Sequence, residues 1–313
     1  MAHPRARSAL HLAATLFRAS HPEPVVAMTT ATALLAAGSG KGARRAVLAT
    51  VAVLAGQLFT GWTNDVRDAD LDRRARRQDK PVAAGELAPE TVRKAMRAAL
   101  PVALVLSRAV GAREFKAHAA GLVAAAAYNF RLRNTQLSFL PYAVAFPMIP
   151  IFAAGEAPPG WVLLAAALIG GAAHFGQVLP DIETDREAGV MGLPQHLGVD
   201  NSARAAAGLL TAAGALLTVA TRRPRTALAA GAAVLSAAGA VKLAGDGKPK
   251  TAFRLIMLSA GLLGAGYALG RRSNEKSGLV DEADERDLPA PDGPVVDDSP
   301  SHEVHLGDDP GPV

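Results

Sequence analysis

The sequence contains no cysteine and few aromatic residues. None of its 313 residues is Cys, and Phe, Trp and Tyr together make up 4%. Without a thiol the chain cannot form disulfides, Cys-ligated zinc sites or iron–sulfur clusters, and it cannot use a cysteine nucleophile. Basic residues lie in short segments between apolar runs and not on an aromatic-rich surface, which argues against nucleic-acid binding.

Charge is also scarce. Asp, Glu, Lys and Arg make up 19% of the chain, against about 25% in an average soluble protein. Half of the residues are apolar and the mean hydropathy is +0.18. The 30 glycines and 21 prolines are spread through the apolar stretches, as is common in membrane helices. The composition therefore predicts an integral membrane protein.

The apolar residues are grouped into runs that are each close to the ~20 residues needed to cross a bilayer as a helix. Helices are expected because extended backbone facing lipid would leave its hydrogen bonds unmet. The sequence thus predicts an all-α, polytopic membrane protein with nine transmembrane helices. The runs are residues 24–40, 45–63, 94–111, 114–130, 137–155, 160–180, 203–220, 225–243 and 252–270.

Three regions are expected along the chain. Residues 1–20 form an N-terminal segment that mixes Leu and Phe with His and Arg, and it can lie on the membrane surface as an amphipathic helix. Residues 21–272 form the transmembrane domain. From Arg271 onward 12 acidic and 4 basic residues give a net charge of −8, whereas the preceding 270 residues carry +13. The acidic segment 273–313 is rich in Asp, Pro and Gly, and we expect it to be disordered.

Lys and Arg are distributed unequally between the two ends of the predicted helices. The side with the N-terminus and residues 64–97 holds 20 of them, and the opposite side holds 12. The positive-inside rule places the N-terminus and the 64–97 segment in the cytoplasm. We expect a multi-pass protein of the plasma membrane.

Two acidic clusters lie at the ends of predicted spans on this side. Asn64, Asp68 and Asp72 are spaced i, i+4, i+8 and fall on one helix face, and Asp181 and Asp185 repeat the i, i+4 spacing. Like charges at this spacing destabilise an isolated helix, and acidic residues at a bilayer boundary usually serve a site.

Of the residues near these two clusters, some continue the same helix faces and others belong to a solvated surface. Gln57 and Gly61 extend the first stripe into the membrane, and His174 and Gln177 precede the second at matching spacings. Asp70 lies off the stripes, and we assign it, like Glu183, to a solvated face. The clustered carboxylates suit Mg²⁺, a hard ion that is completed by water and substrate phosphate. A dense basic run follows the first cluster and, beside the acids, predicts an anionic phosphorylated ligand; it consists of Arg73, Arg74, Arg76, Arg77 and Lys80.

These motifs resemble the two signatures of the UbiA superfamily of intramembrane prenyltransferases. Asn64-Asp65-x-x-Asp68-x-x-x-Asp72, followed by Lys80-Pro81, is similar to the first, and Asp181-x-x-x-Asp185 with Leu193-Pro194 is similar to the second. Tyr128 and Arg133 resemble the central tyrosine–lysine segment, with arginine in place of the usual lysine. The resemblance covers about residues 24–270 and implies nine transmembrane helices around a central cavity.

The resemblance also implies a reaction and roles for residues. An isoprenoid chain is transferred from a prenyl diphosphate to a small hydrophobic, usually aromatic, acceptor in the bilayer. Mg²⁺ is held by Asn64, Asp68, Asp72, Asp181 and Asp185, the four carboxylates being catalytic. Arg67, Lys80 and Arg133 are implied as diphosphate donors, Tyr128 as a group beside the allylic cation, and Gln177 as an acceptor contact.

Two alternatives stay open on the residues alone. The same fold can prenylate a non-aromatic acceptor such as a sugar phosphate or a cyclitol. A transporter with an acidic ion path is an alternative from another class, although carboxylates grouped at one membrane face beside basic residues favour an enzyme. The two readings differ in one geometric expectation: in the enzyme Asp68 and Asp181 open into one cavity, which Lys80 or Arg133 approaches.

Overall fold

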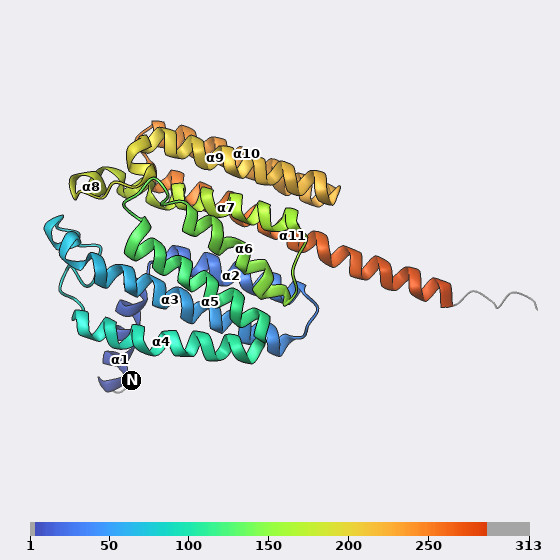
Figure 1. Cartoon of the computed structure of the whole chain (residues 1–313), viewed down its shortest axis with the longest axis horizontal. Helices are drawn as coiled ribbons and strands as arrows, with labels where there is room; N and C mark the ends of the chain where they lie inside the picture. The colour runs from blue at the N-terminus through green and yellow to red at the C-terminus, as the bar shows by residue number, and fades with distance from the viewer. Residues whose placement is uncertain (1–3, 287–313) are drawn as a thin grey trace, which may run out of the picture. The chain divides into compact units, whose positions relative to one another are not determined.

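The computed structural model describes residues 4–286, with side chains from residue 8 to residue 269, and this part of the chain is helical without a strand (Figure 1). The chain divides into two compact units, residues 1–273 and 274–313. The expectation of an all-α protein is confirmed.

Each of the nine apolar runs lies largely in a helix of its own. The helices are α1 (Pro4–Arg18), α2 (Pro22–Gly38), α3 (Ala43–Arg74), α4 (Pro89–Val110), α5 (Ala112–Ala127), α6 (Leu140–Ala154), α7 (Gly160–Val178), α8 (Ile182–Glu187), α9 (Leu193–Thr221), α10 (Pro224–Gly245) and α11 (Pro249–Arg286). A π-helical turn, η1 (Tyr128–Leu132), follows α5, and a 3-10 turn, η2 (Leu179–Asp181), follows α7. The predicted runs correspond to α2–α7 and α9–α11.

Five helical segments are long and apolar enough to cross a membrane within the described residues. They are α3, residues Gly160–Glu187, α9, α10 and Pro249–Leu269 of α11, and α6 is apolar but shorter. The number of nine crossings stays a prediction.

The outer surface of the bundle is apolar. It includes large aliphatic residues that are 66–77% exposed, namely Val105, Val123, Val219, Leu228 and Leu235. Soluble proteins rarely leave such extensive apolar surface uncovered. With the long apolar helices, this surface indicates a multi-pass membrane protein.

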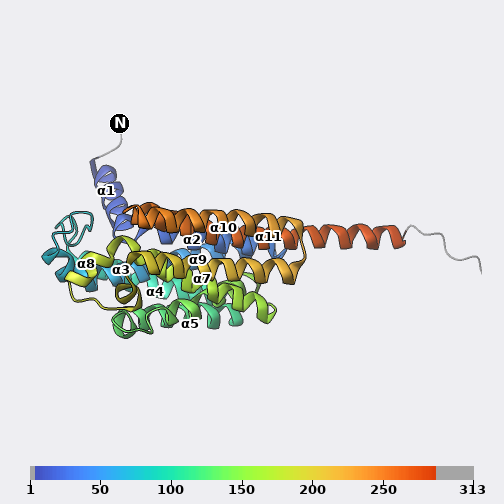
Figure 2. The ribbon, with the colours of Figure 1, turned by 90° about the horizontal axis from the view of Figure 1, so that it is seen from above.

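The helices run alongside one another and pack through small residues (Figures 1 and 2). Helices α7, α9, α10 and α11 share an alanine-rich core, while α2, α3, α5 and α6 share a second one. Helix α6 packs against both α5 and α7 and so joins the two groups. Small side chains allow helix backbones to approach closely in a membrane.

The closest of these approaches joins α3 to the α1–α2 connection. A Cβ atom on Gly61 would lie 2.1 Å from the carbonyl oxygen of Ser20. The Trp62 indole donates a hydrogen bond of 2.8 Å to the carbonyl of Leu16. The connection therefore rests directly on the backbone of α3, at the level where the site begins.

We expect Gly61→Ala to destabilise the protein by about 1–3 kcal/mol, because the added methyl group must displace the Ser20 backbone. The midpoint of thermal unfolding in detergent measures this. Gly231→Ala on α10 is the matched control, since nothing lies within 4 Å of its Cβ position. Equal midpoints for the two variants would contradict the expected contact.

The C-terminal segment differs in part from its expectation. Helix α11 continues to Arg286, whereas the sequence analysis places disorder from residue 273. Residues 274–286 contain several good helix formers, and the prolines of this segment begin only at Pro289. Residues 287–313 lie outside the described residues. At the other end, residues 4–18 are helical as α1, and their location on the membrane surface stays a prediction.

Candidate active site

The first acidic cluster lies on the last turns of α3. At 1.5 Å per residue this 32-residue helix is about 48 Å long, which exceeds the ~30 Å hydrocarbon core. Its C-terminal turns can therefore extend beyond the apolar layer. Asp68 is buried, with an exposed fraction of 8%, and Asn64 donates a hydrogen bond of 3.0 Å to its Oδ2. Asp72 lies one turn further on and is partly buried.

The second cluster lies where α7 ends. Helix α7 stops at Val178, η2 contains Pro180, and α8 begins at Ile182. The sequence predicts one continuous helix face from His174 to Asp185, and the structure differs because the proline has no N–H to donate to the helix. Asp181 thus lies in the 3-10 turn and Asp185 on α8.

Arg133 joins the two clusters. Its Nη1 donates to Asp68 Oδ2, and its Nη2 lies 3.4 Å from Asp185 Oδ1. All three side chains are 10–13% exposed. Arg133 follows the π-helical turn that starts at Tyr128, and its backbone N–H bonds to the Tyr128 carbonyl. π-Helical turns are rare and often found at functional sites.

A second arginine, Arg77, contacts Asp181, the other aspartate of the second cluster. Arg77 Nη1 donates to Asp181 Oδ1 at 3.0 Å, and the same guanidinium bonds to Asp79. The hydrogen bond from Arg77 lowers the pKa of Asp79 to about 2. Asp79 therefore stays ionised and orients Arg77 toward Asp181. The segment after α3 is in this way tied to the second cluster.

The remaining predicted cations take different positions. Lys80 Nζ lies 3.0 Å from Nε2 of His21. Burial lowers the pKa of His21 to about 3, so that its neutral ring accepts a hydrogen bond from the lysine ammonium group. Arg67 Nη1 lies 3.6 Å from Asp68 Oδ1.

Asp65 is 1% exposed, and neither carboxyl oxygen has a hydrogen-bond partner in the described part of the chain. Both Lys80 and Asp72 lie within electrostatic range of Asp65.

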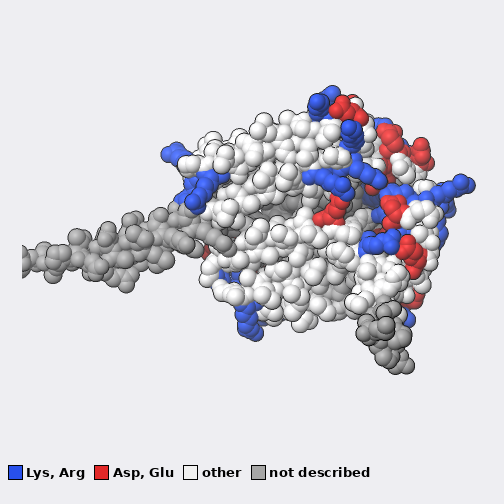
Figure 3. Space-filling view, turned by 180° about the vertical axis from the view of Figure 1, so that it is seen from behind, with Lys and Arg blue, Asp and Glu red and all other residues white. Residues whose placement is uncertain are grey.

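The donor atoms fit Mg²⁺. Four aspartates and one asparagine offer oxygen atoms, which hard cations prefer, and within the described residues no side chain is hydrogen-bonded to the buried Asp65 carboxylate. Within residues 4–286 no three His, Asp or Glu side chains converge closely enough to hold a metal by themselves. Arginine side chains lie between the carboxylates, and Figure 3 shows acidic and basic side chains gathered together at one end of the helices. Such a set suits a metal that arrives with an anionic ligand.

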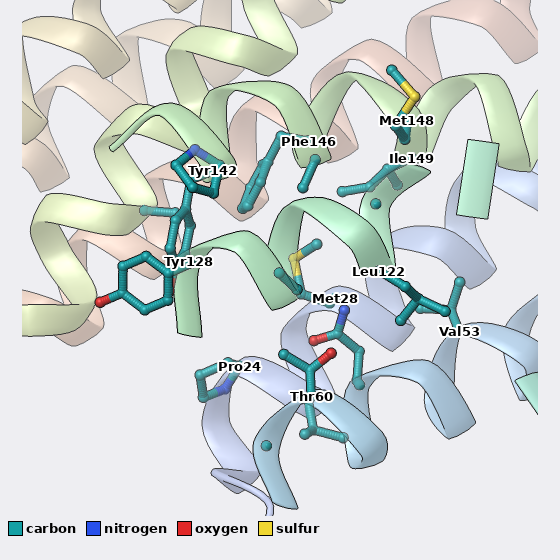
Figure 4. A pocket seen from close by; sticks show the side chains of 18 of the residues that line it. Pro24, Met28, Val53, Thr60, Leu122, Tyr128, Tyr142, Phe146, Met148 and Ile149 are labelled. Atoms are coloured by element: carbon teal, nitrogen blue, oxygen red, sulfur yellow. The ribbon is translucent and has the colours of Figure 1, made fainter. Parts of the chain in front are cut away.

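A cavity of about 180 Å³ extends from this site into the bundle. Five residues named from the sequence line it, namely Gln57, Gly61, Asn64, Tyr128 and Gln177, and neither Asp68 nor Asp181 is among its lining residues. The Tyr128 and Tyr142 rings meet edge to face at 5.2 Å, and the Tyr142 hydroxyl donates to Gln177 Oε1 at 3.2 Å. Figure 4 shows both tyrosines and Phe146 facing the cavity across from Pro24 and Thr60 on α2 and α3.

His174 lies beside these rings but does not line the cavity. It is 1% exposed, and Nε2 is 3.0 Å from the Ser138 hydroxyl. The sequence analysis did not single out Gln195, whose amide donates to Asp185 Oδ2 at 2.8 Å. Its place directly after Leu193-Pro194 was the available signal. Arg77 was noted only as part of the basic run.

Comparisons with known proteins give the family and the fold of this chain. The model of the UbiA prenyltransferase family matches residues 25–262. No curated protein matches the chain. Among solved structures, a UbiA homolog from Archaeoglobus fulgidus bound to GPP and Mg²⁺ is 16% identical, with a TM-score of 0.64 over 83% of this chain and 99% of that one.

Two further structures are similar. The apo UbiA homolog from Aeropyrum pernix K1 is 18% identical, with a TM-score of 0.65 over 78% of this chain and 96% of that one. A digeranylgeranylglyceryl phosphate synthase is 15% identical, with a TM-score of 0.61 over 83% of this chain and 98% of that one. At these identities the structures establish the fold, and the family model covers most of the chain. The chain belongs to the UbiA prenyltransferase family.

Proposed function

We propose that this protein transfers an isoprenoid chain from a prenyl diphosphate to a small hydrophobic acceptor, in the first place an aromatic one, with release of diphosphate. The main support is the guanidinium of Arg133, which contacts Asp68 of the first motif and Asp185 of the second, beside Asn64 of the cavity wall. A site that combines carboxylates with arginines suits a metal-bound diphosphate.

The acidic residues bind the metal in this proposal. Asn64, Asp68, Asp72, Asp181 and Asp185 hold Mg²⁺, and similar proteins from Archaeoglobus fulgidus were solved with Mg²⁺ together with GPP or DMAPP. When bound, Mg²⁺ neutralises the negative charge of the diphosphate as it leaves. Asp65 is a further oxygen donor within the same site.

The basic residues bind the diphosphate oxygens. Arg133 has a planar guanidinium that can donate two hydrogen bonds at once to phosphate, and Arg67 and Lys80 add charge on either side. The bond between C1 of the prenyl group and the diphosphate oxygen breaks, and its electron pair leaves with the diphosphate. C1 then bonds to a carbon or oxygen atom of the acceptor, whose displaced proton passes to the released diphosphate or to water.

The cavity protects the allylic cation. Its walls are mainly apolar side chains, which exclude competing water. The Tyr128 ring lines the cavity and offers a π-face to positive charge. The Tyr142 hydroxyl donates a hydrogen bond to Gln177 Oε1. The amide nitrogen of Gln177 is then available to contact the acceptor.

Two alternatives have different support. The cavity also contains hydrogen-bonding side chains, among them Gln57, Thr60 and Asn129, which favour a hydroxylated acceptor such as a cyclitol or a sugar phosphate. A transporter is disfavoured because the carboxylates are paired with arginines at one end of the bundle and do not continue along the cavity. The excess of basic residues at this end supports a site on the cytoplasmic side of the plasma membrane.

The proposal is tested with purified protein in lipid vesicles. Labelled geranyl diphosphate is supplied with a panel of phenols, quinols and cyclic polyols, and release of diphosphate is measured. We expect release that requires Mg²⁺, ceases with EDTA and returns when Mg²⁺ is restored. A labelled organic product identifies the acceptor class. Vesicles that neither bind nor consume the prenyl diphosphate would refute the proposal.

A further inference from the structure

The far end of the cavity is closed by four residues on three helices. These are Val53 on α3, His118 and Leu122 on α5, and Phe152 on α6. Asn64, at the other end, lies next to the carboxylates. Figure 4 shows the tyrosines at one end of the cavity and Val53 and Leu122 at the other.

His118 is held in one position from two sides. Its Nδ1 lies 2.6 Å from the hydroxyl of Ser107 on α4, which also bonds to the carbonyl of Ala103. Its Nε2 lies 2.5 Å from where a Cβ of Gly56 would be. The ring can therefore occupy this place only because residue 56 is a glycine. Both nitrogens are directed at neighbouring helices, so that the ring presents mainly carbon atoms to the cavity.

Phe152 supports the imidazole from α6. The two ring centroids are 5.2 Å apart and the planes are inclined by 49°. Phe152 is 2% exposed and belongs to a core cluster with Ala49, Ala52 and Ala117. The end of the cavity is thus a fixed pair of rings in front of a packed core.

The position of His118 limits the depth of the cavity. Eight residues separate Gly56 from Asn64 on α3, which corresponds to about 12 Å along the helix. An extended isoprene unit spans roughly 5 Å, given C–C bonds of about 1.5 Å. Two units fill this depth, and a third would meet the imidazole ring.

A second cavity of about 420 Å³ lies beside the first and shares part of its lining. It is lined almost entirely by apolar residues of α2, α6, α7 and α11, and no described residue of α3 lines it. Five residues line both cavities, namely Met28, Phe146, Ile149, Ala173 and Met257. The first cavity follows the α3 face from Asn64 to Gln57, and the His118 ring lies against Gly56, before Val53 is reached.

We propose that His118, positioned by Ser107 and Gly56, sets the upper limit of prenyl chain length at about two isoprene units. This inference rests on the proposed function, because the occupant of the cavity is then the tail of the prenyl diphosphate. His118 determines specificity and takes no part in bond breaking.

The test measures binding and so does not need the acceptor. Dimethylallyl, geranyl, farnesyl and geranylgeranyl diphosphates are bound with Mg²⁺ to the detergent-purified full chain, and Kd is determined for each. We expect farnesyl diphosphate to bind at least about tenfold more weakly than geranyl diphosphate, since a tightly bounded apolar pocket discriminates strongly by size. In His118→Ala, which removes a ring comparable in size with an isoprene unit, this ratio should fall below about threefold.

Paired variants separate this role from general packing. Gly56→Ala should lower the unfolding midpoint, because its methyl group meets the imidazole, and Gly56→Ala combined with His118→Ala should recover it and bind farnesyl diphosphate. His118→Val serves the same purpose should the alanine variant fail to fold. Val123→Ala, at a 69% exposed position of α5, is the control and should keep the wild-type ratio.

The outcomes distinguish the two proposals. If geranyl diphosphate binds and the Kd ratio is the same in wild type, His118→Ala and His118→Val, the chain-length inference is wrong and the proposed function stands. A ratio that changes in Met28→Ala but not in the His118 variants would place the tail in the second cavity and overturn the inference. If no prenyl diphosphate binds to the wild type in the presence of Mg²⁺, both proposals fail.

Discussion

Replacing Asp68 or Asp181 by alanine is expected to abolish prenyl transfer while the protein remains folded in the membrane. Each aspartate faces a polar contact at the end of the bundle, Asp68 with Arg133 and Asp181 with Arg77. Neither side chain belongs to the alanine-rich cores, and Arg133 keeps Asp185 as a partner when Asp68 is removed, so the protein should still fold. Metal ions contribute several kcal/mol to stabilising the leaving group, and loss of a ligand should lower turnover at least roughly 10³-fold.

The measurement is turnover of labelled prenyl diphosphate at saturating substrate, together with the amount of protein in the membrane. Asp70→Ala is the matched control on the same helix. Its carboxylate is 80% exposed and pairs with Arg73, so activity should stay within about twofold of wild type. Near wild-type turnover in either Asp68→Ala or Asp181→Ala would show that the two clusters do not form one metal–diphosphate site.

The first acidic cluster could be predicted from the sequence because helical periodicity fixes it. Residues four apart on a helix share a face, and Asn64, Asp68 and Asp72 do so on a helix that remains regular to Arg74. The sequence places the second cluster at the end of the sixth apolar run but does not predict its local geometry. Pro180 divides the segment into α7, a 3-10 turn and α8, and the effect of a proline on a helix end depends on the surrounding packing.

The contacts between the clusters could not be predicted from spacing. Arg77 and Asp181 are separated by 104 residues, and Arg133 lies 65 residues from Asp68 and 52 from Asp185. Resemblance to a family drew attention to Arg133, whereas Arg77 looked like one of several anchoring residues at a membrane surface. Which arginine turns inward depends on the segment that follows α3, where Asp79 holds the Arg77 guanidinium.

The depth of the cavity was likewise hidden. It depends on the close approach of Gly56 on α3 and His118 on α5, which have no relation in the sequence pattern. A glycine in an apolar helix and a single histidine in another are individually common, and only their contact makes a closed end. The size of the substrate that the cavity admits is therefore a property of helix packing.

Arg133→Ala is expected to lower kcat/KM by roughly 10²–10⁴ and to destabilise the protein by about 3–5 kcal/mol in the absence of metal. The side chains of Asp68, Asp185 and Arg133 are only 10–13% exposed. Without the guanidinium the two carboxylates face each other with no cation between them. Activity is measured at several concentrations of prenyl diphosphate, and stability as the thermal unfolding midpoint with and without Mg²⁺.

Mg²⁺ should raise the unfolding midpoint of Arg133→Ala more than that of wild type, because the metal can replace the missing positive charge between the carboxylates. Arg133→Lys should recover stability in part, since one ammonium group cannot contact both aspartates with the geometry of a guanidinium. Arg131→Ala, at an exposed position of the π-helical turn that precedes Arg133, is the control and should behave as wild type. If Arg133→Ala unfolds at the wild-type temperature and shows no added response to Mg²⁺, Arg133 does not neutralise the paired clusters, and the diphosphate must be bound by other cations of the site.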